Sequence, residues 1–204
     1  MQTDWSTGAQ RSSGGGEPSL AWQEVPGLDL DETPHHGRHH DIIVVGRDDE
    51  LVPERIPEIV LTAGRPILVP PAKPTVTIGE HLAVAWKPGP ESARALTAAA
   101  PLLSKAKRVT LIFVPEGELS AAGASAALNE LAEALRWHDI EPELLVESPS
   151  GAGVGETIRT AAYNVGADLL VMGAYGHSRL REFVLGGATR TIIAGCEIPV
   201  LLFH

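Results

Sequence analysis

Cysteine is nearly absent from this chain, since Cys196 is the only one among 204 residues. A single cysteine forms no internal disulfide, which fits a reducing cytoplasm. Its place near the end of an apolar helical pattern favours a buried, inert thiol. Long apolar runs are also lacking, because no stretch approaches the roughly 18 residues that a membrane span needs. Residues 1–20 have no apolar signal-peptide core. We therefore expect a cytoplasmic protein without a membrane partner.

Positive charge is scarce as well. The sequence has 16 Lys and Arg against 26 Asp and Glu, so its formal net charge is −10. This balance disfavours non-specific binding to nucleic acid, although it leaves room for a local basic pocket. With 44% hydrophobic residues, the chain has the composition of a globular protein and the length of one domain, or of one domain and a fragment. We expect no nucleic-acid partner.

Residues 1–40 lack sustained hydrophobic periodicity and are rich in Gly, Ser, Pro and Asp. Such a segment buries too little apolar surface to offset its ordering entropy, so we expect it to be mostly disordered, with Leu20–Trp22 as a short strand remnant. Four histidines lie close together near its end: His35, His36, His39 and His40. Their spacing can share a divalent metal, but no cysteine or suitable carboxylate completes a closed site. We predict a solvated linker and no metal.

From Asp41 onward, short β-branched runs alternate with amphipathic stretches. The predicted strands cover residues 42–45, 67–69, 82–86, 109–114, 144–146, 169–172 and 200–203. A helix with Ile56, Ile59, Val60 and Ala63 on one face separates the first two strands. The other predicted helices cover residues 91–104, with Leu96, Ala100 and Leu103 inward, and residues 121–137, 155–165 and 187–194. We expect Trp86 and Trp137 in the core or at its edge. The last five strands predict an α/β fold with a five-stranded parallel sheet covered by helices on both faces.

The chain contains a partial internal repeat. DIIVVG at residues 41–46 matches DLLVMG at residues 168–173, and TAGRPILVP at residues 62–70 matches IAGCEIPVLLF at residues 193–203. We therefore predict one complete domain preceded by the last third of a second copy. The predicted division is a low-complexity segment (1–40), a partial domain (41–72), a linker (73–80) and a complete domain (81–204).

Three glycines, Gly173, Gly176 and Gly186, surround the passage from a strand to a helix in GAYGHSRLREFVLGG. At the carboxyl end of a parallel strand, backbone N–H groups and the positive end of the next helix favour an anion. Glycines allow the main chain to approach a ligand closely. The spacing is that of a phosphate loop, but glycine after a strand is equally typical of an ordinary turn.

This stretch, with DLLVMG before it and IPVLLF after it, closely resembles the universal stress protein family. ATP-binding members of that family carry G-x2-G-x9-G-(S/T) here, and the resemblance extends over residues 82–204. It implies a five-stranded parallel α/β sheet and association through the last strand. On that basis we expect self-association through this strand, or an intrachain antiparallel pairing of residues 67–69 with residues 200–203. The N-terminal fragment resembles the end of the first domain in tandem members.

The chain departs from the family pattern at two positions. Gly187 replaces the Ser or Thr whose hydroxyl helps to hold phosphate, and Lys87 replaces the acid that holds the nucleoside. A lysine cannot accept hydrogen bonds from ribose or adenine. The residues predicted to bind a nucleotide or anion are Gly173, Gly176, His177, Ser178, Gly186, Gly187 and Thr189. The resemblance therefore favours the phosphate half of an ATP or AMP site over the nucleoside half.

Two other stretches are predicted to bind no nucleotide. In the partial copy, the acids of Arg47–Glu50 stand where a phosphate would lie. GAGVGE at residues 151–156 ends in a glutamate that would repel a pyrophosphate, so we interpret it as the start of a helix.

Three functions remain open at this point. The first is a non-catalytic stress-response module that acts by protein interaction and binds ATP, AMP or another anion. The others are a weak ATP-hydrolysing enzyme and a ligand-free scaffold. We predict no catalytic residues.

Overall fold

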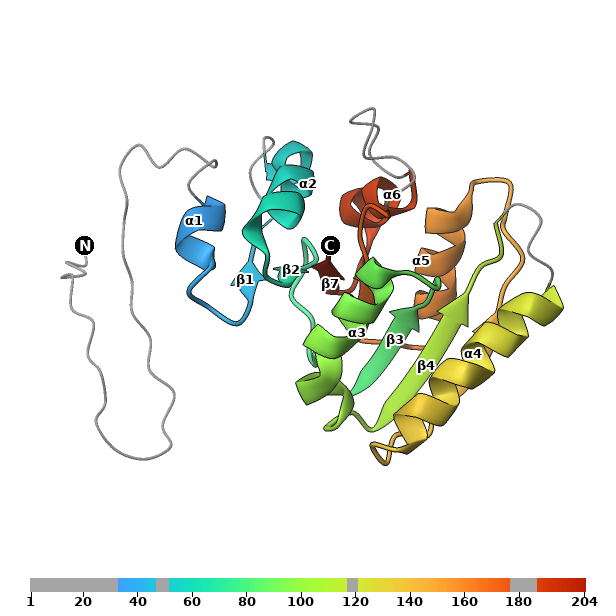
Figure 1. The fold of residues 1–204 in the computed structure, drawn as a ribbon. Coiled ribbons are helices and arrows are strands. Elements are labelled where there is room, and N and C mark those ends of the chain that lie inside the picture. Colours follow the sequence, from blue (N-terminus) through green and yellow to red (C-terminus); the bar gives the residue numbers. More distant parts are fainter. Residues whose placement is uncertain (1–32, 47–51, 117–120, 177–186) are drawn as a thin grey trace.

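The computed structural model describes residues 33–46, 52–116, 121–176 and 187–204 (Figure 1). The strands are β1 (Ile43–Val44), β2 (Ile67–Val69), β3 (His81–Ala85), β4 (Arg108–Phe113), β5 (Glu143–Val146), β6 (Leu169–Gly173) and β7 (Val200–Phe203). The helices are α1 (Thr33–Gly37), α2 (Val52–Ala63), α3 (Pro90–Leu103), α4 (Ala121–Arg136), α5 (Val154–Asn164) and α6 (Gly187–Gly195). The strand remnant expected at Leu20–Trp22 lies outside the described residues.

The strands form one seven-stranded sheet in the order β1-β2-β7-β6-β3-β4-β5. Every neighbouring pair is parallel except β2 and β7, which are antiparallel with Leu68 opposite Leu201. The predicted intrachain pairing of residues 67–69 with the last strand is thus present in the structure. The predicted α/β fold is confirmed, but the expected sheet of five strands is too small, because β1 and β2 extend that same sheet.

Two hydrophobic cores lie on the two faces of the sheet, because successive side chains of a strand point in opposite directions. On β3, Leu82 and Val84 face the core under α3 and α4, whereas Ala83 and Ala85 face the core under α2, α5 and α6. The other central strands alternate in the same way. Burial on both faces explains why these strands are continuous apolar runs in the sequence.

Helices α1 and α2 pack on the same side of the sheet as α5 and α6. The side chains predicted to face inward from α2 are all buried: Ile56, Ile59, Val60 and Ala63. Helix α1, which falls within the segment expected to be mostly disordered, packs beside α2 (Figure 1). A Cβ on Gly37 of α1 would lie 2.1 Å from the Ile43 side chain. The absence of a side chain at that position therefore lets α1 sit directly on β1.

Some side-chain orientations differ from the prediction. Helix α3 buries Ala95, Ala99 and Leu103, while Leu96 is half-buried and Ala100 is exposed. Two small alanines allow the helix to lie close to the sheet, a preference that counting large apolar residues misses. Trp137 follows the end of α4 and is 88% exposed, so its expected place in the core was wrong. The predicted burial of Cys196 is confirmed.

Candidate functional site

The carboxyl ends of β3 and β6 lie side by side at the centre of the sheet, where the order of connection reverses. From β3 the chain crosses to β4 through α3 on one face, and from β6 it crosses to β7 through α6 on the other face. Ligands of open α/β sheets bind at such a switch point, and helix N-termini there favour anions. The predicted glycine loop leaves β6 at this place.

Gly173, the first glycine of the loop, is required for packing. A Cβ at this position would lie 2.6 Å from the backbone nitrogen of Ser92 and 2.7 Å from the carbonyl carbon of Glu91. Both contacts are far too short and both involve backbone atoms. The missing side chain therefore lets the end of β6 touch the start of α3, whether or not a ligand binds nearby.

Tyr175 carries the unusual backbone geometry of the loop. Its φ of 57° lies in the left-handed region, which non-glycine residues rarely adopt. Its hydroxyl oxygen is buried and has no hydrogen-bond partner among the described residues. Burial raises the pKa of this hydroxyl, so Tyr175 remains neutral. A buried hydroxyl and a strained backbone thus lie between the first two glycines of the loop.

Glu91 is the residue that sequence reasoning missed. It lies in the first turn of α3, directly after Pro90, and is only 6% exposed. Its Oε2 is 3.8 Å from the position that a Cβ on Gly176 would take, and 3.3 Å from that of a Cβ on Gly89. The carboxylate therefore lies against the second glycine of the loop. An acid in the first turn of the helix that follows Lys87 was the available signal, since the helix dipole stabilises its charge.

Lys87 points towards the end of β4 and forms an ion pair with Glu116. The two side chains are 72% and 43% exposed. The ammonium group of Lys87 is therefore in contact with solvent, and a surface pair of this kind contributes little to stability. Lys87 is thus at the predicted edge of the sheet, with its charge shared with a carboxylate.

The other predicted ligand residues divide into two groups. Gly187 is exposed at the start of α6, where its carbonyl oxygen accepts a hydrogen bond from Thr191, and Thr189 is buried, with 4% exposure. His177, Ser178 and Gly186 lie outside the described residues. The structure therefore places Gly173, Gly176 and Lys87 at one edge of the sheet, together with the first turn of α6.

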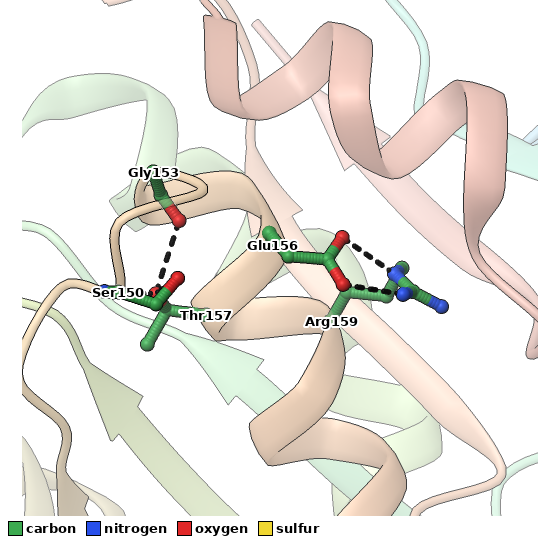
Figure 2. Close-up of polar contacts among 5 residues, drawn as sticks. All are labelled: Ser150, Gly153, Glu156, Thr157 and Arg159. Carbon is green, nitrogen blue, oxygen red and sulfur yellow. Dashed lines mark hydrogen bonds and ion pairs between the residues drawn. The ribbon is translucent and has the colours of Figure 1, made fainter.

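The stretch GAGVGE forms the start of α5, as predicted, and polar contacts link the preceding loop to the helix (Figure 2). The Thr157 hydroxyl accepts a hydrogen bond from the Ser150 backbone nitrogen at 2.9 Å and donates to the Gly153 carbonyl oxygen at 3.0 Å. Glu156 and Arg159 form an ion pair on the same helix. These bonds hold the loop before the helix against its first turn, whereas the N-cap residue, Gly153, makes no side-chain capping hydrogen bond.

A buried histidine lies at the opposite, amino-terminal edge of the sheet. His81 is 7% exposed, and its Nε2 is 2.9 Å from the Thr110 hydroxyl oxygen. Burial, reinforced by the positive charge of Arg108, lowers the pKa of His81. The imidazole is therefore held neutral, and protonation opposes folding.

Asp168 joins β6 to the start of β3 at that same edge. Its carboxylate accepts hydrogen bonds from the backbone N–H groups of Gly79, Glu80 and His81, at 3.0, 3.1 and 3.0 Å. Burial by itself would raise the pKa of this carboxyl, but these bonds and one from the Thr77 hydroxyl outweigh it and lower the pKa. The charged carboxylate thus fixes the beginning of β3.

The described residues contain no cluster of three His, Cys, Asp or Glu side chains that could hold a metal ion. His35, His36, His39 and His40 are exposed. Within the same residues, no helix is both long and apolar enough to cross a membrane. The acidic stretch Arg47–Glu50 lies outside the part of the chain that the structure describes.

Comparison with known proteins gives the family. The model of the universal stress protein family matches residues 80–204. A universal stress protein of Synechocystis sp. is 53% identical over 37 residues, which are 18% of this chain and 13% of that protein. The crystal structure of a universal stress protein from Archaeoglobus fulgidus is similar, with 18% identity and a TM-score of 0.67 over 85% of this chain and 66% of the other. This chain thus spans just under two thirds of the length of that structural relative.

A further solved universal stress protein is in complex with cAMP. It has 20% identity and a TM-score of 0.49, over 61% of this chain and 96% of the other. The cAMP is a property of that protein. Because the family model covers more than half of the sequence, and because the sheet has the fold of the solved relative from Archaeoglobus, this chain belongs to the universal stress protein family.

Proposed function

We propose that this chain is a non-catalytic stress-response module that acts by binding other proteins and takes an adenine nucleotide or another small anion where β3 and β6 end. One arrangement supports the ligand: the loop at Gly173–Gly176 leaves β6 beside the end of β3, and both following helices begin at that edge. Their N-terminal N–H groups favour negative charge there.

In this proposal, Glu91 supplies the acid that the family pattern has at position 87 and that this chain replaces with Lys87. Its carboxylate is an acceptor for the hydroxyl groups of a ribose, and it lies beside Gly176, where a nucleoside would join its phosphates. The helix dipole of α3 stabilises its charge. Gly187, at the start of α6, takes the phosphate side together with the predicted residues of the intervening loop.

Isothermal titration with ATP, AMP and inorganic phosphate tests this ligand. We expect Glu91→Gln to weaken ATP and AMP about tenfold or more, since a hydrogen bond to a charged group contributes roughly 1.5–3 kcal/mol. Phosphate binding should change little. Glu141→Gln is the matched control, because that carboxylate is exposed and pairs with Arg136, which is no part of the candidate site. Absence of heat with all three ligands would remove the ligand from the proposal, and nucleotide turnover would favour the weak ATPase.

The ligand-free scaffold remains the second candidate, and Gly173 is the observation that favours it. This glycine is explained by the contact of β6 with α3 alone. A motif glycine with a complete packing role is no argument for a phosphate. Mass spectrometry of the purified native protein separates the two functions, because a scaffold carries no nucleotide.

In this proposal the last strand pairs within the chain and not with a partner. β7 is hydrogen-bonded to β6 on one edge and to β2 on the other. No edge of β7 is then available for a second copy, so we propose that the pairing with β2 replaces a dimer. Sedimentation of the full chain should give a monomer, and a stable dimer would contradict this part.

A further inference from the structure

Strand β1 has an open edge. The Ile43 and Val45 backbone nitrogens donate to the carbonyl oxygens of Pro66 and Leu68, both at 3.0 Å. Because N–H groups alternate in direction along a strand, those of Ile42 and Val44 point away from β2. Among the described residues, no strand pairs with β1 on that side. In the part of the chain that the structure describes, the sheet therefore ends in unpaired backbone groups, which proteins normally protect.

The matching strand of the complete domain, β6, shows which part of β1 lacks cover. Leu169 and Val171 of β6 are 0% exposed, whereas their counterparts in the repeat, Ile42 and Val44, are 39% and 61% exposed. On the other face, Ile43 is buried in the manner of its counterpart Leu170. β1 is thus covered on the α2 side and uncovered on the side that α3 and β3 protect in the complete domain.

The sequence before β1 contains a counterpart of β3. Ser-Leu-Ala-Trp at residues 19–22 matches Ala-Val-Ala-Trp at residues 83–86, with a small residue, an aliphatic one, alanine and tryptophan in the same order. In the complete domain this stretch of β3 pairs with β6, Val84 opposite Val171. The repeat therefore places Leu20 opposite Val44.

The connection satisfies the rules for parallel strands. Residues 23–40 separate the two stretches, and a parallel crossover requires about a dozen residues or more. Helix α1 lies within this connection, on the α2 side of β1, because Gly37 packs on Ile43. Helix α5 precedes β6 on the same side. A strand at the open edge, followed by α1 and β1, would thus repeat the right-handed crossover of the complete domain.

We propose that residues 19–22 bind along the open edge of β1 as a parallel strand, with Leu20 covering Val44. The segment belongs to this chain, so the edge is closed without a partner. The Leu20 side chain would lie beside Val44 on the exposed face of β1, and the backbone of the segment would satisfy the outward N–H of Val44.

Residue-resolved hydrogen exchange of the full-length chain tests this directly. We expect the Val44 amide of the wild-type protein to exchange slowly. Leu20→Asp should accelerate that exchange about tenfold or more, which corresponds to roughly 1.4 kcal/mol of pairing free energy. The Ile43 amide donates to Pro66 and is the internal reference, since it should stay slow in every variant. Gln10→Asp makes the same charge change outside the segment and should leave Val44 slow.

Three results would overturn the proposal. Fast exchange of Val44 in the wild-type protein would show that the edge is open. Slow exchange that Leu20→Asp does not alter would mean that another segment covers β1. Protection of Val44 that grows with protein concentration would assign the edge to a second copy of the chain.

Discussion

Gly173→Ala separates a packing role for the glycine loop from a ligand role. The new Cβ would stand 2.6 Å and 2.7 Å from backbone atoms of Ser92 and Glu91, where contacts below 3.0 Å essentially never occur. A flexible side chain cannot relieve this clash, so the end of β6 must move away from α3. Such overpacking costs about 1–3 kcal/mol. For a chain of this size we expect the melting temperature to fall about 2–4 °C for each kcal/mol.

Urea unfolding followed by circular dichroism measures this loss without added ligand. A lower midpoint with an unchanged m-value would indicate lost stability of the same fold. Gly187→Ala is the matched control in the same motif, because among the described residues no atom beyond its chain neighbours and its own helix backbone lies within 4 Å of its Cβ position. We expect that variant to stay within about 0.5 kcal/mol of the wild-type protein. If Gly173→Ala proves as stable as Gly187→Ala, the packing argument is wrong.

Three further predictions concern stability and assembly. The pKa of His81 in the folded state lies below the usual 6.5. The stability that the neutral imidazole contributes is therefore complete above pH 6.5 and declines as the pH falls towards the folded-state pKa. His81→Gln should flatten that part of the plot of unfolding free energy against pH. Asp168→Asn should cost about 2–3 kcal/mol in urea unfolding, because the hydrogen bonds to the start of β3 lose their charged acceptor; an unchanged midpoint would contradict this role. Deletion of residues 1–72 should uncover one edge of β7 and cause self-association in sedimentation experiments, whereas a monomer of equal stability would refute the role of β2.

Local patterns were sufficient to predict the helices and strands, whereas the pairing of residues 67–69 with the last strand was expected from the resemblance to the family. The repeat of DIIVVG and DLLVMG predicted two similar strands, and both are buried on the face that they share. Ile56, Ile59 and Val60 predicted the inward face of α2, because large aliphatic residues at helical spacing have one stable orientation against a sheet. The alanine-rich α3 has no such dominant stripe, so its orientation could not be predicted in the same way.

The candidate site was predictable only in part, because its residues come from different strands. The glycine spacing identifies the loop after β6, but not the reason for Gly173, which depends on the backbone of a helix some 80 residues earlier. Glu91 belongs to no motif of the loop, and only the folding of β3 beside β6 brings its carboxylate to Gly176. Lys87 was noticed in the sequence, whereas its ion pair with Glu116 depends on the pairing of β3 with β4.

The sequence by itself determined the α/β alternation, the repeat and the family, because hydrophobic periodicity and short motifs are properties of neighbouring residues. The tertiary structure decided that seven strands share one sheet, that Glu91 lies at the glycine loop, and that Val44 of β1 is exposed to a large extent. Each of these depends on which distant segments touch. Contacts of that kind follow from the packing of whole elements, which no local stretch of residues specifies.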